Sequence, residues 1–414
     1  MEDPRLEKTK LENILKEVGR DTESLVEEMK SSYWINKLVR TISSTIHGRA
    51  RNYGLDCCRL IVSSFSPWLT VYDPETKMLR RVRGTESHVL TGMPSTGKSS
   101  WFSIIENQGL NVIKTQVSTQ GGILGTPIDM GLTEYLQNSV WLLPEAEISL
   151  SSPVIVNILR SLIEEQEVGK TSAYVVSKTR LLKIHSSVCL SLVNIPSTGK
   201  EIQLLSRLHR VNFDFNNIEE VLNVGQLLTN NLMEIPEISE SFEPEPRHYF
   251  GLIANKVLDL GLNENKFLCS LSSEHKREIY NSWYNLVHEY YENSRMPKGI
   301  ALRDLVEGFR SSQNYGLLNL FQREVKQVKG FNVLYLTEED LNHGLEFMRR
   351  VVETRSGYET ESMRETRFRI PVRTIVQIYE LSRQGLSARE ISRRVGLSHT
   401  SVSRYLREMG VENE

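Results

Sequence analysis

The sequence predicts an α/β protein with a parallel sheet, followed at its C-terminus by a small all-α unit. Apolar runs alternate with helical patterns from residue 88 to residue 216, which is typical of a parallel sheet covered by helices. A G-x-x-x-x-G-K-[ST] motif follows the first of these runs. Residues 386–398 have the pattern of a helix-turn-helix.

Composition is that of an ordinary globular protein. The 414 residues allow two or three domains, and the net charge of −2 means that nucleic-acid binding would need local basic patches. No apolar run of about 18 residues occurs, and residues 1–4 include two acidic residues and no apolar run typical of a signal peptide, so we expect a cytoplasmic protein without a membrane partner. The four cysteines lack metal-site spacing and are expected to be reduced and buried.

Five parts are expected along the chain. They are an N-terminal helical segment (1–35), an α/β core (36–235), a helical region (236–355), a linker (356–370) and a helix-turn-helix unit (371–414). The first segment reads as one amphipathic helix over 5–31, and a hairpin is expected over 68–82. The candidate strands of the core are 88–91, 110–114, 140–143 and 188–193, which are short and apolar.

The phosphate-binding motif spans 92–99. Its glycines let the backbone wrap a phosphate, and the N–H groups at the start of the next helix face the anion. Lys98 is expected to reach the β- and γ-phosphates of ATP, and Ser99 to place its hydroxyl on Mg²⁺. The expected nucleotide contacts are Gly92, Pro94, Ser95, Thr96, Gly97, Lys98, Ser99 and Ser100.

ATP hydrolysis at such a motif also needs a carboxylate at the end of a second strand, which binds the metal and orients the attacking water. The apolar run 140–143 is followed by Pro144 and Glu145, and we expect Glu145 to polarise the attacking water and to lie near the metal. The position of the usual metal-orienting Asp is occupied by Pro144. Glu147 is the other carboxylate available there, and the alternative for both glutamates is a solvated loop.

The C-terminal unit is predicted to read DNA. Ser387 and Glu390 form a capping box, and Gly396 makes the turn between the two helices. Residues 364–409 hold ten Arg and four Glu, which gives the unit a local positive charge. The expected DNA contacts are Arg389, His399, Thr400, Ser401 and Arg404. A three-helix module that docks on a protein is the alternative.

Eight short segments occur in a fixed order. They are 44–48 (STIHG), 79–84 (LRRVRG), 92–99 (GMPSTGKS), 163–166 (IEEQ), 194–196 (NIP), 204–207 (LLSR), 301–305 (ALRDL) and 336–340 (LTEED). Together they resemble the AAA+ core of the MCM replicative helicase family, over about residues 36–354.

The resemblance implies an AAA+ ATPase core with a helical lid over 236–355. It implies that Asn194 senses the γ-phosphate and that Arg207 and Arg303 act on the nucleotide of a neighbouring subunit, in a homo-oligomeric ring such as a hexamer. It also implies a basic hairpin between residues 170 and 183 that contacts DNA, for which Lys178 is the candidate.

Three features depart from that family. The N-terminal collar has no counterpart in residues 1–35, Pro144 replaces an Asp, and Leu208-His209 follows Arg207 where the family has Phe-Asp. The first reading of the function is therefore an ATP-driven DNA helicase or translocase. The second is a nucleotide-switched DNA-binding protein that hydrolyses ATP weakly, and the third is a transcription regulator that uses the loop for stability alone.

Overall fold

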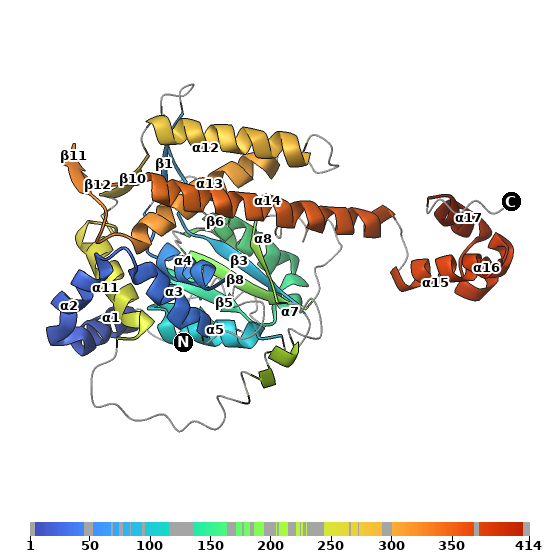
Figure 1. Cartoon of the computed structure of the whole chain (residues 1–414), viewed down its shortest axis with the longest axis horizontal. Helices are drawn as coiled ribbons and strands as arrows, with labels where there is room; N and C mark the ends of the chain where they lie inside the picture. The colour runs from blue at the N-terminus through green and yellow to red at the C-terminus, as the bar shows by residue number, and fades with distance from the viewer. Residues whose placement is uncertain are drawn as a thin grey trace. The chain divides into compact units, whose positions relative to one another are not determined.

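The chain forms two compact units, which are residues 1–293 with 298–352, and residues 353–414 with 294–297. The computed structural model (Figure 1) describes residues 5–44, 53–67, 69–73, 78–82, 84–92, 96–115, 132, 136, 138–163, 171–175, 178–182, 186–193, 204, 207–213, 221–223, 225–226, 229, 244–264, 266–271, 273–291, 300–367 and 372–408.

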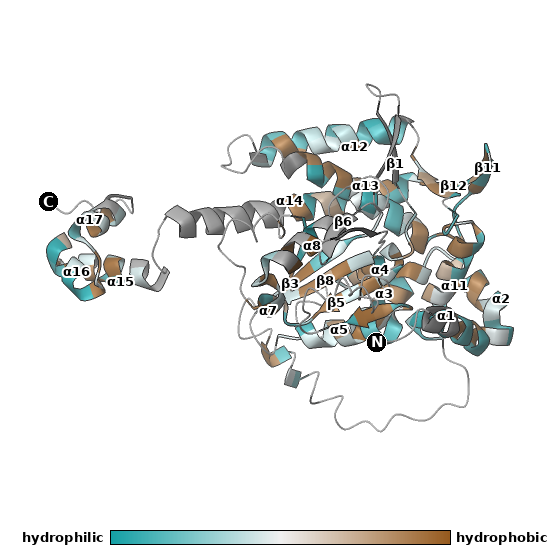
Figure 2. Cartoon of the chain, turned by 180° about the vertical axis from the view of Figure 1, so that it is seen from behind, coloured by the Kyte–Doolittle hydropathy of each residue, from teal (hydrophilic) through white to brown (hydrophobic). Residues whose placement is uncertain are grey.

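A five-stranded parallel sheet is the centre of the first unit, which confirms the predicted α/β class. Its strands, in chain order, are β3 (Ser87–Thr91), β4 (Val112–Lys114), β5 (Ser139–Leu143), β8 (Ser186–Leu192) and β9 (His209–Asn212). Their spatial order is β4-β5-β8-β3-β9. The first four match the predicted strands, and β9 was not predicted. The central strands are among the most hydrophobic elements of the chain (Figure 2).

Alternate residues of each strand face two separate cores. Leu90, Leu142 and Cys189 belong to the core that holds the apolar side chains of α4 (Gly54–Ser63) and α5 (Lys98–Gln108). Their neighbours in sequence, such as Val89 and Val188, pack with α7 (Ala146–Leu150) and α8 (Pro153–Ile163). Both faces are therefore covered by helices, as parallel sheets require.

A second, mixed sheet corrects the prediction for residues 236–355. Its order is β11 (Val325–Val328), β12 (Phe331–Tyr335), β10 (Phe267–Ser270), β1 (Leu69–Asp73) and β2 (Met78–Val82). The predicted hairpin β1–β2 is confirmed. Three strands come from the region predicted to be helical, because short strands that pair with distant segments leave little local periodicity to read.

The helices of this region are α11 (Pro246–Asp259), α12 (Ser273–Leu286) with a π-helical turn (Val287–Tyr291), α13 (Ile300–Leu318) and α14 (Glu338–Arg367). Helix α14 continues to Arg367, so the described part of the predicted linker is helical. This stretch is rich in Glu and Arg, which are good helix formers.

The single helix predicted over 5–31 is divided in two. The structure has α1 (Arg5–Val18), a 3₁₀ turn (Gly19–Asp21) and α2 (Thr22–Met29), followed by α3 (Trp34–Ser44). Gly19 has φ of +43°, which an L side chain rarely adopts and which interrupts the α-helix. Among the described residues, no helix has the length and apolar character needed to cross a bilayer.

The second unit contains α15 (Val372–Arg383), α16 (Ala388–Val395) and α17 (His399–Glu408) around a small core. That core consists of Ile378, Leu381, Ile391, Val402, Tyr405 and Leu406. The predicted capping box is present, since the carboxylate of Glu390 accepts from the Ser387 N–H at 2.9 Å. Gly396 ends α16 with φ of +70°, in the left-handed conformation that glycine favours.

A buried ionic network joins the parallel sheet to helices α4, α13 and α14. At its centre Arg59 of α4 donates to Asp56 Oδ1 at 2.7 Å and to Glu86 Oε1 at 3.2 Å. These three side chains are at most 4% exposed. The guanidinium of Arg59 also lies 3.9 Å from the ring centre of Phe347 on α14. Glu86 directly precedes β3, so the network anchors the strand that leads to the phosphate-binding motif.

The network continues through α13 and α14. His209 on β9 donates from Nε2 to Glu307 Oε2 at 2.8 Å, and Arg310 donates to Glu307 Oε1 at 2.6 Å. Arg350 contacts Asp56 at 3.2 Å. We use "ionic network" below for Asp56, Arg59, Glu86, His209, Glu307, Arg310 and Arg350. It contains three carboxylates and three guanidinium groups.

Opposing effects set the pKa values of the two acidic groups beside Arg59. Burial alone raises the pKa of Glu86 and of Asp56. The charge of Arg59 outweighs it, together with the hydrogen bond of Glu86 to His88 and the charge of Arg350 beside Asp56, so both pKa values lie below normal. The contribution of these ion pairs to stability is therefore complete above the unfolded-state pKa values near 4 and is lost as the pH falls below them.

Arg59→Met should lower the free energy of unfolding of the first unit by about 3–5 kcal/mol, because it leaves two buried carboxylates without their shared cation. Urea unfolding followed by tryptophan fluorescence reports on this unit alone, since all five tryptophans lie in it. The matched control is Lys114→Met, which removes an exposed pair with Glu106 and should cost less than about 1 kcal/mol. Equal effects of the two substitutions would contradict a central role for Arg59.

Candidate functional site

The phosphate-binding motif lies at the carboxyl end of β3. Gly92 has φ of +143° and Gly97 has φ of +100°, so both glycines occupy backbone conformations that L side chains rarely adopt. Helix α5 begins directly after Gly97, and its first residue is Lys98. The Lys98 ammonium donates to the carbonyl of Gly92, which folds the side chain back over the loop. Residues 93–95, including the predicted contacts Pro94 and Ser95, lie outside the described residues.

The start of α5 presents polar groups suited to an anion. Thr96 is buried, Ser99 is exposed, and Ser100 is partly exposed. The first N–H groups of any α-helix lack partners within the helix, and its aligned peptide dipoles favour a negative charge at this end. In strand–loop–helix motifs that bind phosphate, the anion lies against a helix start of this kind.

The strand order reverses at β3. Strands β4, β5 and β8 lie on one side of it and β9 on the other, while α5 and α8 cover opposite faces of the sheet. In open parallel sheets, ligands bind beyond the carboxyl ends of the strands at such a switch point. The motif therefore occupies the position where the topology favours ligand binding.

Glu145 is at the same edge of the sheet, two strands from β3. It follows the end of β5 and Pro144, occupies the N-cap position of α7, and is exposed. Adjacent strands are about 4.8 Å apart, so the ends of β5 and β3 are separated by about 10 Å across β8. A phosphate chain and a hydrated cation fit into that distance.

Glu147 has a different role from Glu145. Its carboxylate accepts a hydrogen bond from the backbone N–H of Val193, just after β8, and so ties the ends of the two neighbouring strands together. This bond stabilises the loop edge on which Glu145 lies. Asn194, the next residue after Val193, lies outside the described part of the chain.

Arg210 on β9 is a cation at the site that the sequence analysis missed. Its Nε donates to Thr91 Oγ1 at 3.1 Å, at the last residue of β3 before the phosphate-binding motif. The side chain is partly buried. No local motif marks Arg210, and only the pairing of β9 with β3 reveals its position.

The two arginines predicted to act on a neighbouring subunit lie on separate elements. Arg207 is a partly buried turn residue just before β9, and its N–H donates to the carbonyl of Leu204 at 3.0 Å. Arg303 is a partly buried residue in the first turn of α13.

The predicted basic hairpin is present as β6 (Thr171–Val175) and β7 (Lys178–Leu182). Lys178 is the first residue of β7 and pairs with Val175, next to the turn of the hairpin.

In the second unit, most of the predicted DNA contacts are on its surface. Arg389 on α16 and His399 and Thr400 at the start of α17 are exposed. The N–H of Ser401, which is partly exposed, donates to Ser398 Oγ at 3.1 Å, so Ser398 caps α17. The side chain of Arg404 lies outside the described part.

A separate trio, Glu86, His88 and His209, has ligand atoms close enough together to suggest a metal ion. The carboxylate of Glu86 already contacts the Arg59 guanidinium at 3.2 Å and accepts from Asn314 at 2.9 Å. A divalent cation placed there would be repelled by Arg59. Burial lowers the pKa of His88. Glu86 and His209 belong to the ionic network, and His88 lies beside it with Nε2 3.4 Å from Glu86 Oε2.

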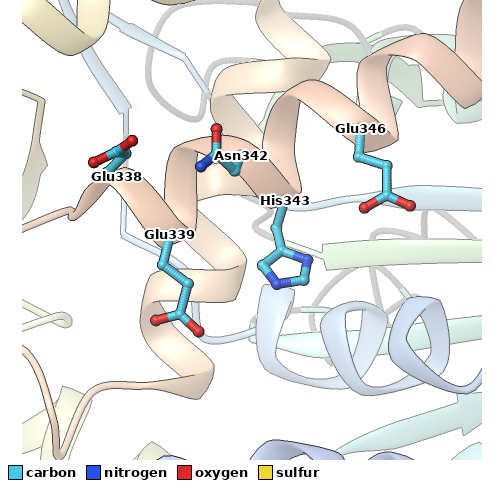
Figure 3. Close-up of a pocket in the computed structure, with 5 residues that line it drawn as sticks. All are labelled: Glu338, Glu339, Asn342, His343 and Glu346. Carbon is cyan, nitrogen blue, oxygen red and sulfur yellow. The ribbon is translucent and has the colours of Figure 1, made fainter.

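A pocket on α14 is also unsuited to a nucleotide. It is lined by Glu338, Glu339, Asn342, His343 and Glu346, which all project from α14 (Figure 3). Its three carboxylates would repel a polyphosphate. The ring of His343 stacks on Tyr315, with ring centres 3.8 Å apart, and partial burial lowers its pKa.

The sequence matches no protein-family model, and no curated protein matches it. The function is therefore inferred from the residues and geometry described above.

Gly97→Ala should weaken ATP binding about 5- to 30-fold, because a Cβ in the left-handed region costs about 1–2 kcal/mol and distorts the loop. Fluorescent-nucleotide titration of the full chain measures the change. The matched control is Gly330→Ala, which imposes a similar strain at φ of +83° in the β11–β12 turn and should leave the affinity for ATP unchanged. A Gly97→Ala protein with wild-type affinity would show that this loop does not hold the phosphates.

Proposed function

We propose that the protein is an AAA+ ATPase, similar to the MCM family, that binds ATP with Mg²⁺ and acts on DNA as a helicase or translocase in the cytoplasm. The observation that carries the proposal is the arrangement of the parallel sheet. The phosphate-binding motif at the end of β3 and Glu145 at the end of β5 lie at one edge, with β8 between them.

In this proposal each residue of the site has one role. Lys98 and the N–H groups at the start of α5 hold the phosphates, and Ser99 holds Mg²⁺. Glu145 orients and deprotonates the attacking water, with Asn194 positioned on the γ-phosphate. Arg210, held against Thr91, adds a positive charge beside the loop.

Subunits form a homo-oligomeric ring in which Arg207 and Arg303 reach the nucleotide of a neighbour. A positive charge supplied across an interface stabilises the charge on the transferred phosphoryl group. The β6–β7 hairpin, with Lys178 next to its turn, contacts the DNA that passes through the ring. The second unit binds duplex DNA with α17 in the major groove.

A nucleotide-switched DNA-binding protein with weak hydrolysis is the second candidate. Two observations favour it, because Pro144 stands where a metal-orienting carboxylate is usual and the carboxylate of Glu147 is engaged by the Val193 N–H. Glu145 is then the single carboxylate at that strand end left for metal and water. In this case ATP binding assembles subunits on DNA without sustained movement.

Glu145→Gln should reduce DNA-stimulated ATP hydrolysis by at least about 100-fold, the usual contribution of a catalytic acid–base group, while ATP still binds. Steady-state phosphate release, measured with and without DNA, gives the rate. Lys98→Ala should abolish binding as well as hydrolysis. If the wild-type protein binds ATP through Lys98 but does not hydrolyse it, the helicase proposal is wrong and the nucleotide-switched DNA-binding protein is the better candidate.

Arg389→Ala should weaken binding to a mixed-sequence duplex and reduce the salt dependence of log K by roughly one phosphate contact. Fluorescence anisotropy at several salt concentrations, with the full chain, measures both quantities. Lys114→Ala removes an exposed cation of the first unit and should change neither. If Arg389→Ala leaves affinity and salt dependence unaltered, α16 does not contact the DNA backbone.

A further inference from the structure

The two residues after Arg207, Leu208 and His209, depart from the resembled family, and the surroundings of His209 give a physical reason for its departure. His209, where the family has Asp, donates to Glu307 Oε2 at 2.8 Å and lies 3.8 Å from Glu86 Oε2. Both carboxylates are at most 4% exposed. An Asp at this position would place a third negative charge against two buried ones, whereas a histidine supplies an N–H donor to Glu307.

The His209–Glu307 hydrogen bond joins the two segments that carry the trans-acting arginines. Arg207 precedes His209 by two residues, in the turn that leads into β9. Arg303 precedes Glu307 by four residues on α13, so the two side chains share one face of that helix. Side chains that are buried and bonded at both ends have few alternative rotamers, and the bond therefore restrains the turn relative to the helix.

Glu307 is itself held in place. Its second oxygen accepts from Arg310 at 2.6 Å, one turn further along α13. The ring of His209 packs edge-on against Phe347 of α14, with ring centres 4.5 Å apart. The hydrogen bond therefore lies within a packed, fixed environment and not at a surface where water would compete with it.

We propose that His209 and Glu307 are positioning residues, which hold Arg207 and Arg303 as one unit against the nucleotide of the neighbouring subunit. This inference rests on the proposed ATPase function. Its specific consequence is that loss of the bond impairs hydrolysis at the neighbour's site and leaves the subunit's own phosphate-binding loop intact.

Subunit mixing in full-length protein tests this consequence. His209→Leu should lower DNA-stimulated hydrolysis at least tenfold while ATP still binds with an affinity within twofold of wild type. Lys98→Ala subunits are inactive but keep Arg207 and His209. When the two variants are mixed in equal amounts, about a quarter of the sites combine an intact loop with an intact neighbour, so hydrolysis should return to about that fraction of the wild-type rate in a heterologous ring.

Two further variants separate positioning from folding. His209→Gln keeps an N–H donor near the place of Nε2 and should retain at least half of the wild-type rate. Glu307→Gln keeps the shape of the acceptor and should lower hydrolysis about fivefold, a loss large enough for Lys98→Ala subunits to restore the rate toward a quarter of the wild-type value. Glu307→Gln replaces His209→Leu in the mixing experiment if the latter fails to unfold cooperatively.

The outcomes distinguish this inference from the proposed function. Arg207→Ala mixed with Lys98→Ala is the reference, and it should recover the same fraction. Recovery with Arg207→Ala but not with His209→Leu or Glu307→Gln would overturn the positioning role and leave the ring ATPase standing. If neither mixture recovers activity, Arg207 does not act at the neighbouring subunit's nucleotide, and the positioning role falls with it. A wild-type protein that does not hydrolyse ATP would overturn both proposals.

Discussion

The buried ion pair of Arg59 with Glu86 and Asp56 is the interaction on which the first unit depends. Charges taken out of water are costly unless each has partners in good geometry, and here each has at least one. The partners come from α4, the segment before β3, and α14. The network therefore couples the positions of these elements, and it links the strand that leads to the phosphate-binding motif to α14, more than 200 residues away in sequence.

The same ion pair fixes the start of the strand that leads to the candidate nucleotide site. Glu86 directly precedes β3, a strand of five residues, and Gly92 and Lys98 follow its other end. Strand β9 lies beside β3 and presents its side chains to both faces in turn. His209 enters the ionic network, and Arg210, the next residue, points to the opposite face and bonds to Thr91.

Local signals predicted a large part of this structure. Four parallel strands, the β1–β2 hairpin and the capping box at Ser387 follow from apolar runs and turn residues. The β6–β7 hairpin was expected from the family resemblance alone. Strand β9, the three strands of the second sheet and Arg210 were missed, because they depend on pairing between segments far apart in sequence. The ionic network combines residues from positions 56 to 350, and no pattern of spacing predicts that they meet. The break at Gly19 is a different case. Glycine is a helix breaker that the sequence shows directly, but the amphipathic pattern continues across it, and a single helix over 5–31 was therefore predicted.

In the proposed ATPase, Pro144 stands where the resembled family has an acidic residue, and the residues around it still suit Mg²⁺. Mg²⁺ keeps several waters and is commonly held by one or two carboxylates together with the phosphates of the substrate. Ser99 at the start of α5, the phosphates themselves and Glu145 across β8 can supply that set. Glu147 contributes indirectly, since its bond to the Val193 N–H keeps the ends of β5 and β8 in register. Among the described residues, Glu145 is thus the exposed carboxylate that the end of β5 leaves for metal and water. In the proposed ATPase, we therefore expect hydrolysis to depend on how accurately a neighbouring subunit positions its arginines.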